Sequence, residues 1–516
     1  MFRSMYFWPV LSVIIIFLLE LIYRLFYGFS RFDIYDSILY ICLLVSVVAW
    51  GKNRVLSVLA LFYSALVYFS QMVGYAVYGY WVPPIYYVLF FEKPLEALQS
   101  TGDVLVHALP ALTISSVVVA TLLFLRKKRV DSGYAYVDIV FLLVFFFLPV
   151  KTYLADGGRG EVLNDRYSAI KAGYYSTSYL LGKYIPDAVT GKEYFSEYSG
   201  QRLLPGADKK FSNVIFVMGE SLSSSNMSVF GYARDTTPWL KNSAESGNGV
   251  VVKAYSSGTF TDITLPMFFN LIPTPNGDRQ IASRKTNIFG FAREHGYKTA
   301  FYSAQQADGL ALMNKVGLEF IDDYKNSTDL GYDSFTSALD MELVDYLDDI
   351  DWSKNNFVVL HQRGSHARYT QRVPAGFAPF GTEGFLNQYD NTVAYTDEFV
   401  AAVVSRVSKM SADDDWVVFF TSDHGQSVTD NNIGFGSLVN PSDYMVPAAV
   451  WAGDMSLIED DMQVFRGCDV IFHYQLATLL AKSLGADIRV AGCDTGYVNG
   501  SRMNGSAGFI EMLNTP

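Results

Sequence analysis

The stretch NVIFVMGES, residues 213–221, decides the fold of the C-terminal part of the chain. An unbroken apolar run ends at Gly219, Glu220 and Ser221. Such a short run is typical of a buried strand. Similar runs follow at KTAFY (298–302), FVVL (357–360), WVVFF (416–420) and AAVW (448–451).

Helical patterns separate these runs, at residues 287–295, 338–347 and 392–410. Strands that alternate with helices predict an α/β domain with a mainly parallel sheet. We assign this domain to residues 211–516, because roughly 300 residues are ample for such a core.

The N-terminal part of the chain has a different character. Half of the 516 residues are hydrophobic and only 17% are charged, against about 25% in soluble domains. The apolar excess lies in five runs, at residues 5–26, 34–50, 55–77, 104–125 and 136–150. Each run approaches or exceeds the ~17–25 residues that cross a bilayer. The first is too long for a cleaved signal peptide. We therefore predict a five-helix transmembrane domain over residues 1–153.

Basic residues set the expected orientation of these helices. Lys52 and Arg54 follow the second run, and RKKR (126–129) follows the fourth. The positive-inside rule makes both loops cytoplasmic, so everything after the fifth helix lies outside the cytoplasm. Arg31, in a loop assigned to the outside, does not fit this orientation.

Residues 154–210 are polar and rich in tyrosine, with a helical pattern over 165–184. We interpret them as a linker on the membrane surface. Glu20, inside the first run, is expected to pack against a neighbouring helix. The net charge of −12 argues against a nucleic-acid partner, which requires a basic face.

Possible metal ligands follow three of the predicted strands. Glu220 follows the first, Asp423 and His424 follow the run at 416, and His366 follows the run at 357. Ligand sites in open α/β sheets lie beyond the carboxyl ends of the strands. Carboxylates and imidazoles suit Zn²⁺, with Mn²⁺ also possible. Each residue alone is explained as a helix cap or a satisfied polar group, but their coincidence favours a metal site.

The segment SSGTFTDITLP, residues 256–266, is rich in hydroxyl groups, with Thr259, Thr261 and Thr264. An alcohol bound to a divalent ion loses its proton readily and becomes a nucleophile. The alternative is a cluster of helix caps and turns, which composition alone favours.

Several stretches together resemble the membrane-bound phosphoethanolamine transferases of Gram-negative bacteria, of the alkaline phosphatase and sulfatase superfamily. They are NVIFVMGESLSSSNMSVFGYARDTTPWL (213–240), SSGTFTDITLP (256–266), HQRGSHARYTQRVP (361–374) and TSDHGQS (421–427). Their order and spacing match the family, as do five spans before a periplasmic catalytic domain. The resemblance implies an alkaline phosphatase/sulfatase-like fold for residues 211–516.

The resemblance also implies roles for individual residues. Glu220, Thr261, Asp423 and His424 match zinc ligands, and Thr261 matches the nucleophile that accepts the phosphoryl group. His366 matches a histidine near the transferred headgroup or at a second zinc, with a role in catalysis and substrate binding.

A further stretch, EKPLE (92–96), resembles a family segment that helps to bind the ethanolamine headgroup, with Glu96 as the matching residue. Val88 and Glu92 stand where the family often has Asn and Thr.

The chain departs from the family pattern at other positions. Ser257 and Met267 stand where many members have a pair of cysteines, and Gln426 replaces a common acidic residue. No histidine occurs between His424 and Val446, where lipid A-modifying members usually carry one. These departures leave the nucleophile and the first zinc site intact. They argue against a second metal site and against lipid A as the acceptor.

Three cysteines remain. Cys42 lies in the second apolar run. Cys468 and Cys493 fall in the domain expected outside the cytoplasm, where they form a disulfide or remain two buried thiols. His473 is expected to be structural.

The function implied by the resemblance is transfer of phosphoethanolamine from phosphatidylethanolamine to an envelope glycolipid, the lipid A or a core sugar of lipopolysaccharide. A zinc-activated threonine and a covalent phosphothreonine would carry the group. The protein would be a multi-pass protein of the bacterial inner membrane with its catalytic domain in the periplasm. The alternatives are a phosphoglycerol transferase of the same superfamily acting on a periplasmic glycan, and an inactive metal-binding envelope scaffold.

Overall fold

The computed structural model divides into two compact units. The first comprises Met1–Gly157, Glu161–Lys192 and Asn431–Ile433, and the second comprises Gly158–Gly160, Glu193–Asp430 and Gly434–Pro516. The residues that the structure describes are 2–27, 32–78, 81–82, 84, 87, 105–129, 133–154, 166–190, 202–206, 211–275, 277–307, 312–411, 414–436, 438–500 and 508–513.

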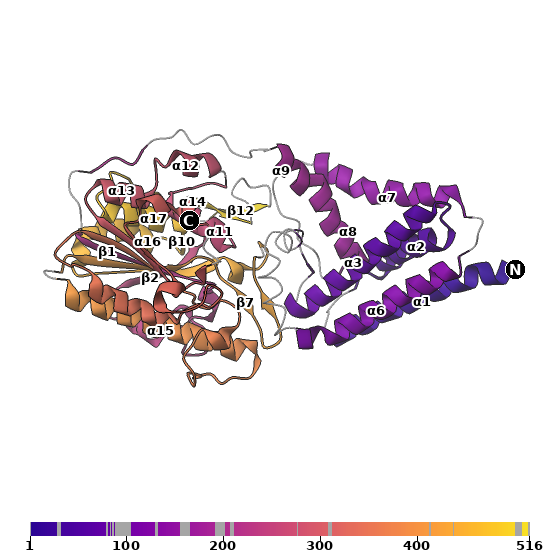
Figure 1. Ribbon diagram of the computed structural model, residues 1–516, viewed down its shortest axis with the longest axis horizontal. Helices are drawn as coiled ribbons and strands as arrows, with labels where there is room; N and C mark the ends of the chain where they lie inside the picture. The colour runs from indigo at the N-terminus through magenta and orange to yellow at the C-terminus, as the bar shows by residue number, and fades with distance from the viewer. Residues whose placement is uncertain are drawn as a thin grey trace. The chain divides into compact units, whose positions relative to one another are not determined.

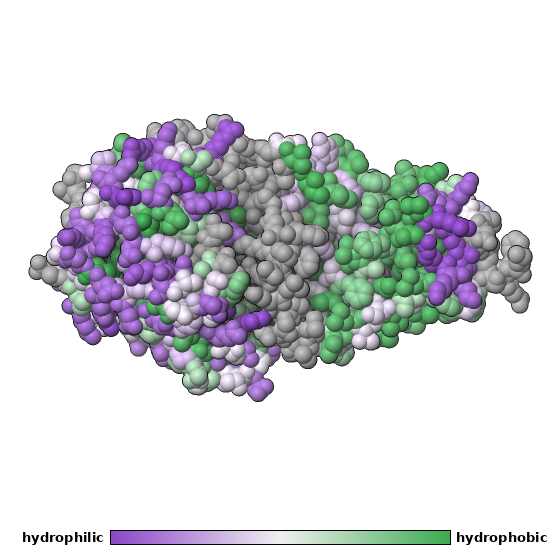
Figure 2. Space-filling view, viewed as in Figure 1, coloured by the Kyte–Doolittle hydropathy of each residue, from purple (hydrophilic) through white to green (hydrophobic). Residues whose placement is uncertain are grey.

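The first unit is helical (Figure 1). Its helices are α1 (Phe2–Phe26), α2 (Ile34–Trp50), α3 (Arg54–Tyr78), α6 (Leu105–Lys127), α7 (Ala135–Leu154), α8 (Ala169–Tyr179), the π-helical η1 (Leu180–Tyr184) and α9 (Ile185–Thr190). Large apolar side chains are exposed on several of them, for example Leu143 and Phe147 of α7. Figure 2 shows the resulting hydrophobic surface in green.

Within the described residues, four helices are long and apolar enough to cross a membrane. They are Tyr6–Phe26, Arg54–Ala76, Ala108–Lys127 and Ala135–Leu154. The second predicted span, α2, is apolar but has only 17 residues, or about 26 Å at the rise of an α-helix. Because the hydrocarbon core is about 30 Å thick, a fifth crossing by α2 stays a prediction.

The two basic loops lie at the same end of the helical unit. Arg129, after α6, donates hydrogen bonds to the carbonyl oxygens of Gly51 and Lys52, after α2. Tyr134 N donates to Trp50 O over 2.7 Å. This contact meets the requirement that both loops face the same side of a membrane.

The predicted linker needs correction over residues 169–190, because α8, η1 and α9 belong to the helical unit. Most of the side chains of α8 are buried, and the helical pattern expected over 165–184 is confirmed. At Gly173 an added Cβ would lie 2.2 Å from Val67 Cγ1, so α8 packs closely on α3. Glu20 of α1 accepts a hydrogen bond from Ala169 N over 3.1 Å. The small and polar residues that let α8 pack closely on α3 also occur in linkers, so composition alone did not distinguish a packed helix from a linker.

The second unit is built on an eight-stranded sheet, in the order β10-β2-β9-β6-β1-β5-β3-β4. The strands are β1 (Asn213–Gly219), β2 (Val250–Tyr255), β3 (Lys298–Ser303), β4 (Asp323–Lys325), β5 (Asn356–His361), β6 (Trp416–Ser422), β9 (Met445–Ala452) and β10 (Val470–Phe472). Separate two-stranded sheets join β7 (Ser427–Val428) to β8 (Ile433–Gly434) and β11 (Thr495–Asn499) to β12 (Phe509–Leu513).

The five predicted strands are present as β1, β3, β5, β6 and β9. Five of the seven pairings in the large sheet are parallel. The exception is β9, which runs antiparallel to both β2 and β6. A buried apolar run has the same pattern in either direction, so the sequence did not reveal this reversal.

Helices cover both faces of the sheet (Figure 1). On one face lie α11 (Thr261–Phe269), α13 (Ile288–Glu294), α16 (Glu459–Arg466) and α17 (His473–Ser483), and on the other lies α15 (Gly384–Met410). Alternate residues of β1, including Val214, Phe216 and Met218, pack into the core of the first face. The predicted helices at 287–295 and 392–410 correspond to α13 and to the end of α15, whereas 338–347 overlaps the 3₁₀-helical η7 (Asp340–Asp349).

Among the described residues, the remaining helical segments are short. They are α10 (Pro238–Glu245), α12 (Asp278–Ser283), α14 (Met313–Val316) and the 3₁₀ turns Ser224–Asn226, Ser228–Phe230, Leu318–Phe320, Ser327–Leu330, Tyr369–Gln371, Pro441–Asp443 and Met455–Ile458. Cys468 and Cys493 form a disulfide, which resolves the alternatives left open by the sequence.

Candidate active site

The sheet brings two of the predicted ligand segments side by side. Strands β1 and β6 are parallel neighbours, and Gly219 is paired with Ser422 at their carboxyl ends. Glu220 and Asp423 are therefore the next residues of two adjacent strands. Thr261 arrives from a different direction, as the first residue of α11 after the loop that follows β2.

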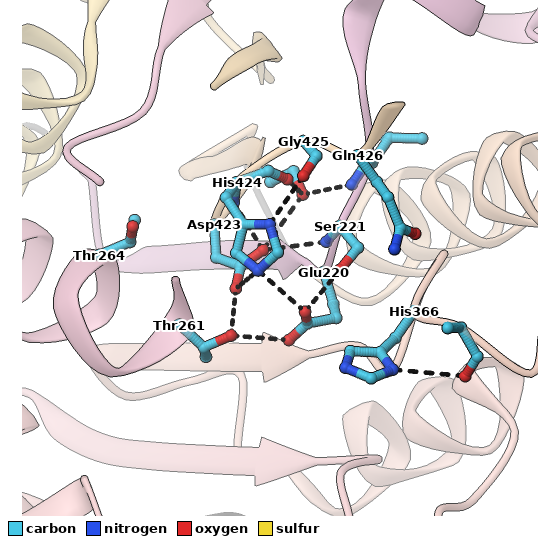
Figure 3. A network of polar contacts seen from close by, with 12 residues as sticks. Glu220, Ser221, Thr261, Thr264, His366, Asp423, His424, Gly425 and Gln426 are labelled. Atoms are coloured by element: carbon cyan, nitrogen blue, oxygen red, sulfur yellow. Dashed lines mark hydrogen bonds and ion pairs between the residues drawn. The ribbon is translucent and has the colours of Figure 1, made fainter. Parts of the chain in front are cut away.

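These residues point toward one another (Figure 3). Glu220, Asp423 and His424 each offer one ligand atom, and these three atoms lie within 4.8 Å of one another. Among the described residues they form a cluster of the size that holds a metal ion. Thr261 Oγ1 lies 2.6 Å from Asp423 Oδ2 and 3.2 Å from Glu220 Oε2. All three members of the cluster are buried, and Thr261 is half-buried. The structure thus brings together the four residues predicted as ligands.

The imidazole of His424 is oriented for metal binding. Its Nδ1 lies 2.8 Å from Gly425 O and donates to it. Its Nε2 faces Glu220 Oε1 at 3.4 Å and Asp423 Oδ2 at 3.5 Å. Metal-binding histidines commonly donate their other ring N–H to a backbone carbonyl in this way. One imidazole nitrogen, two carboxylates and a hydroxyl are a donor set that fits Zn²⁺.

Electrostatics in the cluster also favour a cation. Burial raises the pKa of Asp423, and the neighbouring Glu220 charge raises it further, to about 7. Burial alone lowers the pKa of His424, but the two carboxylates outweigh burial and raise it to about 10. Burial raises the pKa of Glu220, but the hydrogen bond and charge of His424 bring it well below its usual value. Without a metal, the His424 proton supplies the positive charge that the carboxylates require.

These pKa values predict how metal affinity depends on pH. Binding must displace the proton of His424 below about pH 10 and a second proton, from Asp423, below about pH 7. Apparent Zn²⁺ affinity should therefore rise about tenfold per pH unit above pH 7, and up to about a hundredfold per unit below it. Competition with a chelator between pH 5.5 and 8.5, corrected for chelator protonation, measures this slope. An affinity independent of pH would contradict the assignment of these ligands.

Neighbouring residues that the sequence did not single out hold the ligands in place. Gln305, after β3, donates from Nε2 to Glu220 Oε2 over 2.9 Å. Ser221, in the left-handed region at φ 57°, donates its backbone N–H to Asp423 Oδ1 over 3.0 Å. At Gly364 an added Cβ would lie 2.7 Å from Glu220 O, so only glycine fits there. The strand-end rule could have found Gln305, because it follows a predicted strand.

His366 lies beside the cluster rather than within it, near Glu220 (Figure 3). Its Nδ1 is 3.1 Å from Arg363 Nη2. The same Nδ1 lies 3.3 Å from Ala367 O, so it accepts from Arg363 in one tautomer and donates to Ala367 in the other. Desolvation lowers the pKa of His366 well below its usual value, and the Arg363 charge lowers it further. Glu96, predicted to bind substrate, lies outside the described residues.

Gln426, which replaces the acidic residue common in the family, is buried. Its Oε1 accepts a hydrogen bond from the hydroxyl group of Tyr369 over 2.9 Å. The uncharged amide of Gln426 is therefore sufficient to accept the hydrogen bond from Tyr369.

The segment that carries these residues is similar to known proteins. Residues 212–457 match the family model described as Sulfatase. The Kdo(2)-lipid A phosphoethanolamine 7''-transferase of Escherichia coli (strain K12) is 30% identical over 271 residues, which cover 47% of this chain and 45% of that protein. Phosphatidylethanolamine transferase Mcr-2 of Escherichia coli is 26% identical over 271 residues, covering 48% of this chain and 50% of that protein. The chain spans about half the length of these curated relatives.

The fold likeness extends further along the chain. The solved structure of the integral membrane protein lipooligosaccharide phosphoethanolamine transferase A (EptA) from Neisseria meningitidis matches with a TM-score of 0.57 and 17% identity. The match covers 93% of this chain and 95% of that one, so apolar N-terminal helices followed by a C-terminal sheet domain are common to both folds. Glu220, Thr261, Asp423 and His424 all lie inside residues 212–457, the segment that matches the sulfatase family model.

Proposed function

We propose that this protein transfers phosphoethanolamine from phosphatidylethanolamine to an envelope glycolipid, the lipid A or a core sugar of lipopolysaccharide. The observation that supports this most is the placement of the Thr261 hydroxyl against Asp423 and Glu220, beside His424. A hydroxyl held by a metal-binding cluster suits group transfer through a covalent intermediate. The similarity to a phosphoethanolamine transferase and to a phosphatidylethanolamine transferase supports the choice of group.

Glu220, Thr261, Asp423 and His424 would hold a Zn²⁺ ion, with Mn²⁺ as the alternative. When bound, the ion lowers the pKa of the Thr261 hydroxyl and offsets negative charge on the phosphoryl oxygens. Gln305 and Ser221 keep the two carboxylates oriented by the hydrogen bonds that they donate.

In the first step, Thr261 Oγ1 attacks the phosphorus of the donor lipid. A bond forms between Oγ1 and phosphorus, and the bond from phosphorus to the glycerol oxygen breaks. Diacylglycerol leaves with a proton on that oxygen, and Thr261 holds phosphoethanolamine. Because Thr261 is the first residue of the nine-residue α11, the positive end of the helix dipole favours the phosphate group there.

In the second step, a hydroxyl group of the acceptor attacks the phosphorus and Thr261 Oγ1 is released. The acceptor loses its proton and Thr261 regains one, so the balance is closed. His366, which its lowered pKa keeps neutral, would be the general acid or base that exchanges a proton with a substrate oxygen. Glu96 would contact the ethanolamine group.

The apolar helices suit a lipid donor, because they would keep the enzyme in the bilayer that contains its substrate. We propose that the protein is a multi-pass protein of the bacterial inner membrane. The basic loops would be cytoplasmic, and the sheet domain would lie in the periplasm, where the Cys468–Cys493 disulfide forms readily.

The test is to trap the intermediate. Purified protein in detergent, incubated with zinc and phosphatidylethanolamine but no acceptor, is expected to gain a phosphoethanolamine group on Thr261, measured by mass spectrometry of the peptide that contains it. A glycerol phosphate adduct after incubation with phosphatidylglycerol would support the phosphoglycerol alternative instead. No adduct from either donor, in a sample that binds zinc, would support the inactive scaffold. Glycolipid from cells with and without the gene then identifies the acceptor by its mass shift.

A further inference from the structure

The loop at residues 256–260 connects β2 to α11 and determines where Thr261 lies. Some of its hydrogen bonds are local: Ser256 Oγ donates to Gly258 O over 2.6 Å, and Thr264 Oγ1 donates to the same oxygen over 3.2 Å. Such bonds shape the loop, but they do not fix it relative to the strands that carry Glu220 and Asp423. Other contacts must do so.

One such contact is the buried imidazole of His473, the first residue of α17. Ser257 donates its backbone N–H to His473 Nδ1 over 3.3 Å. Thr421 Oγ1 lies 3.1 Å from His473 Nε2 and donates its own proton to Pro447 O over 2.7 Å. Nδ1 therefore accepts and Nε2 donates, a neutral tautomer in which every polar atom of the ring is satisfied. Burial keeps this ring neutral by lowering its pKa to about 3.

This ring joins the two halves of the candidate active site. Thr421 lies in β6, two residues before Asp423, and Ser257 lies four residues before Thr261. The same imidazole thus contacts the strand that leads to a predicted ligand and the loop that leads to the predicted nucleophile. Phe268 of α11 also packs edge-on against it, with ring centroids 5.4 Å apart.

The end of β11 holds the other side of the loop. Asn499 N donates to Ser257 O over 2.9 Å, and Thr259 N donates to Asn499 O over 3.1 Å. This is an isolated parallel bridge centred on Gly258. The Asn499 side chain is buried and donates from Nδ2 to Met267 Sδ, in α11, over 3.3 Å.

Close packing is absent from part of this region. A cavity of about 250 Å³ adjoins it, with Ser257, Met267, His473, Thr495 and Gly496 in its wall. Because there is space beside Ser257, hydrogen bonds rather than packing hold the loop on that side. Loss of the bond to His473 would allow the loop to move toward the cavity.

We propose that His473 is a positioning residue, which together with Asn499 holds the loop at 256–260 so that Thr261 meets Asp423 and Glu220. The proposal rests on the proposed function, because its catalytic consequence requires that Thr261 is the nucleophile. It assigns to the chain from β10 onward, which supplies no predicted ligand, control over the geometry of the reaction.

The experiment replaces His473 with phenylalanine, which keeps the ring volume and the contact with Phe268 but removes both hydrogen bonds. We expect kcat to fall about 10- to 100-fold, as for a nucleophile misplaced by about 1 Å. KM for the donor lipid, zinc content and Tm should stay close to those of the unmodified protein. His473→Gln, which can still accept from Ser257 and donate to Thr421, should recover part of the lost kcat.

The matched control is His295→Phe, because His295 is partly exposed at the end of α13 and stacks on Phe291 at 4.1 Å. It should leave kcat unchanged. Thr421→Val should lower kcat in the same direction as His473→Phe, and the two effects should not add, since both interrupt one chain of hydrogen bonds.

Hydrogen exchange gives a readout that needs no activity. Peptides that contain Ser257 and Thr259 should exchange faster in His473→Phe than in His295→Phe, while peptides from β1 should not change. Equal kcat in the two variants, or unchanged exchange at 256–260, would overturn the proposal. A loss of kcat explained entirely by lower Tm or lost zinc would also overturn it. If the unmodified protein transfers no group from any donor, the proposed function fails, and faster exchange at 256–260 still supports the positioning contact.

Discussion

Replacing Thr261 by alanine is expected to abolish group transfer, lowering kcat by about 10⁴-fold or more, as for other enzymes that lose a covalent nucleophile. The hydroxyl oxygen lies 2.6 Å from Asp423 Oδ2 and 3.2 Å from Glu220 Oε2, and alanine removes it without adding volume. No other hydroxyl of α11 can substitute, because Thr264 Oγ1 is buried and donates to Gly258 O.

Zinc content should be largely retained in Thr261→Ala, since Glu220, Asp423 and His424 remain. Folding should be retained too, because the side chain is half-buried at the start of its helix. The control is Thr261→Ser, which keeps the hydroxyl and should retain measurable transfer. Activity, zinc content and Tm are measured on the same preparations. Full activity in Thr261→Ala would eliminate the covalent mechanism.

Replacing Asp423 by asparagine is expected to weaken zinc binding by more than about 100-fold. Loss of a residue that only hydrogen-bonds to a metal ligand typically costs about 10- to 100-fold in affinity, and Asp423 is proposed to be a ligand itself. Asparagine has nearly the same shape and can still accept from Ser221 N and His424 N through one oxygen. It lacks the negative charge that the cluster supplies to a cation. Transfer should fall to background at zinc concentrations that saturate the unmodified protein.

A matched control for this variant is Asp390→Asn. Asp390 is also a buried carboxylate, but it accepts from Tyr232, Asn226 and Arg234 and is not part of the cluster of Glu220, Asp423 and His424. This change should lower Tm and leave zinc affinity unaltered. If Asp423→Asn and Asp390→Asn bind zinc equally well in chelator competition, Asp423 is not a ligand.

Local patterns in the sequence were enough to predict the strands that build the centre of the sheet. The runs at 213–218 and 416–420 became β1 and β6, because consecutive β-branched and aromatic residues fit a fully buried strand. The rule that ligands follow the ends of parallel strands placed Glu220 and Asp423 at one edge, and the structure brings them together with His424.

Other features depend on contacts between distant segments and have no local pattern. Gln305 and Gly364 become relevant only when the sheet places β5 next to β1 and β3 next to β5, where one contacts the Glu220 side chain and the other its backbone. The burial of α8 against α3 depends on a close approach at Gly173, which composition cannot distinguish from a flexible linker.

The sequence by itself determined that apolar helices precede an α/β domain, and which acidic, imidazole and hydroxyl groups are available for chemistry. These properties follow from periodicity and residue type, which are local. The resemblance predicted that Thr261 joins Glu220 and Asp423, encoded about 40 and 160 residues away, and the structure brings them together. Only the tertiary structure decided that β9 is antiparallel and that His473 contacts the loop before Thr261. Residues this far apart in the chain are brought together by the order of the strands and by core packing. Both depend on several segments at once, so no single segment of sequence specifies its partner.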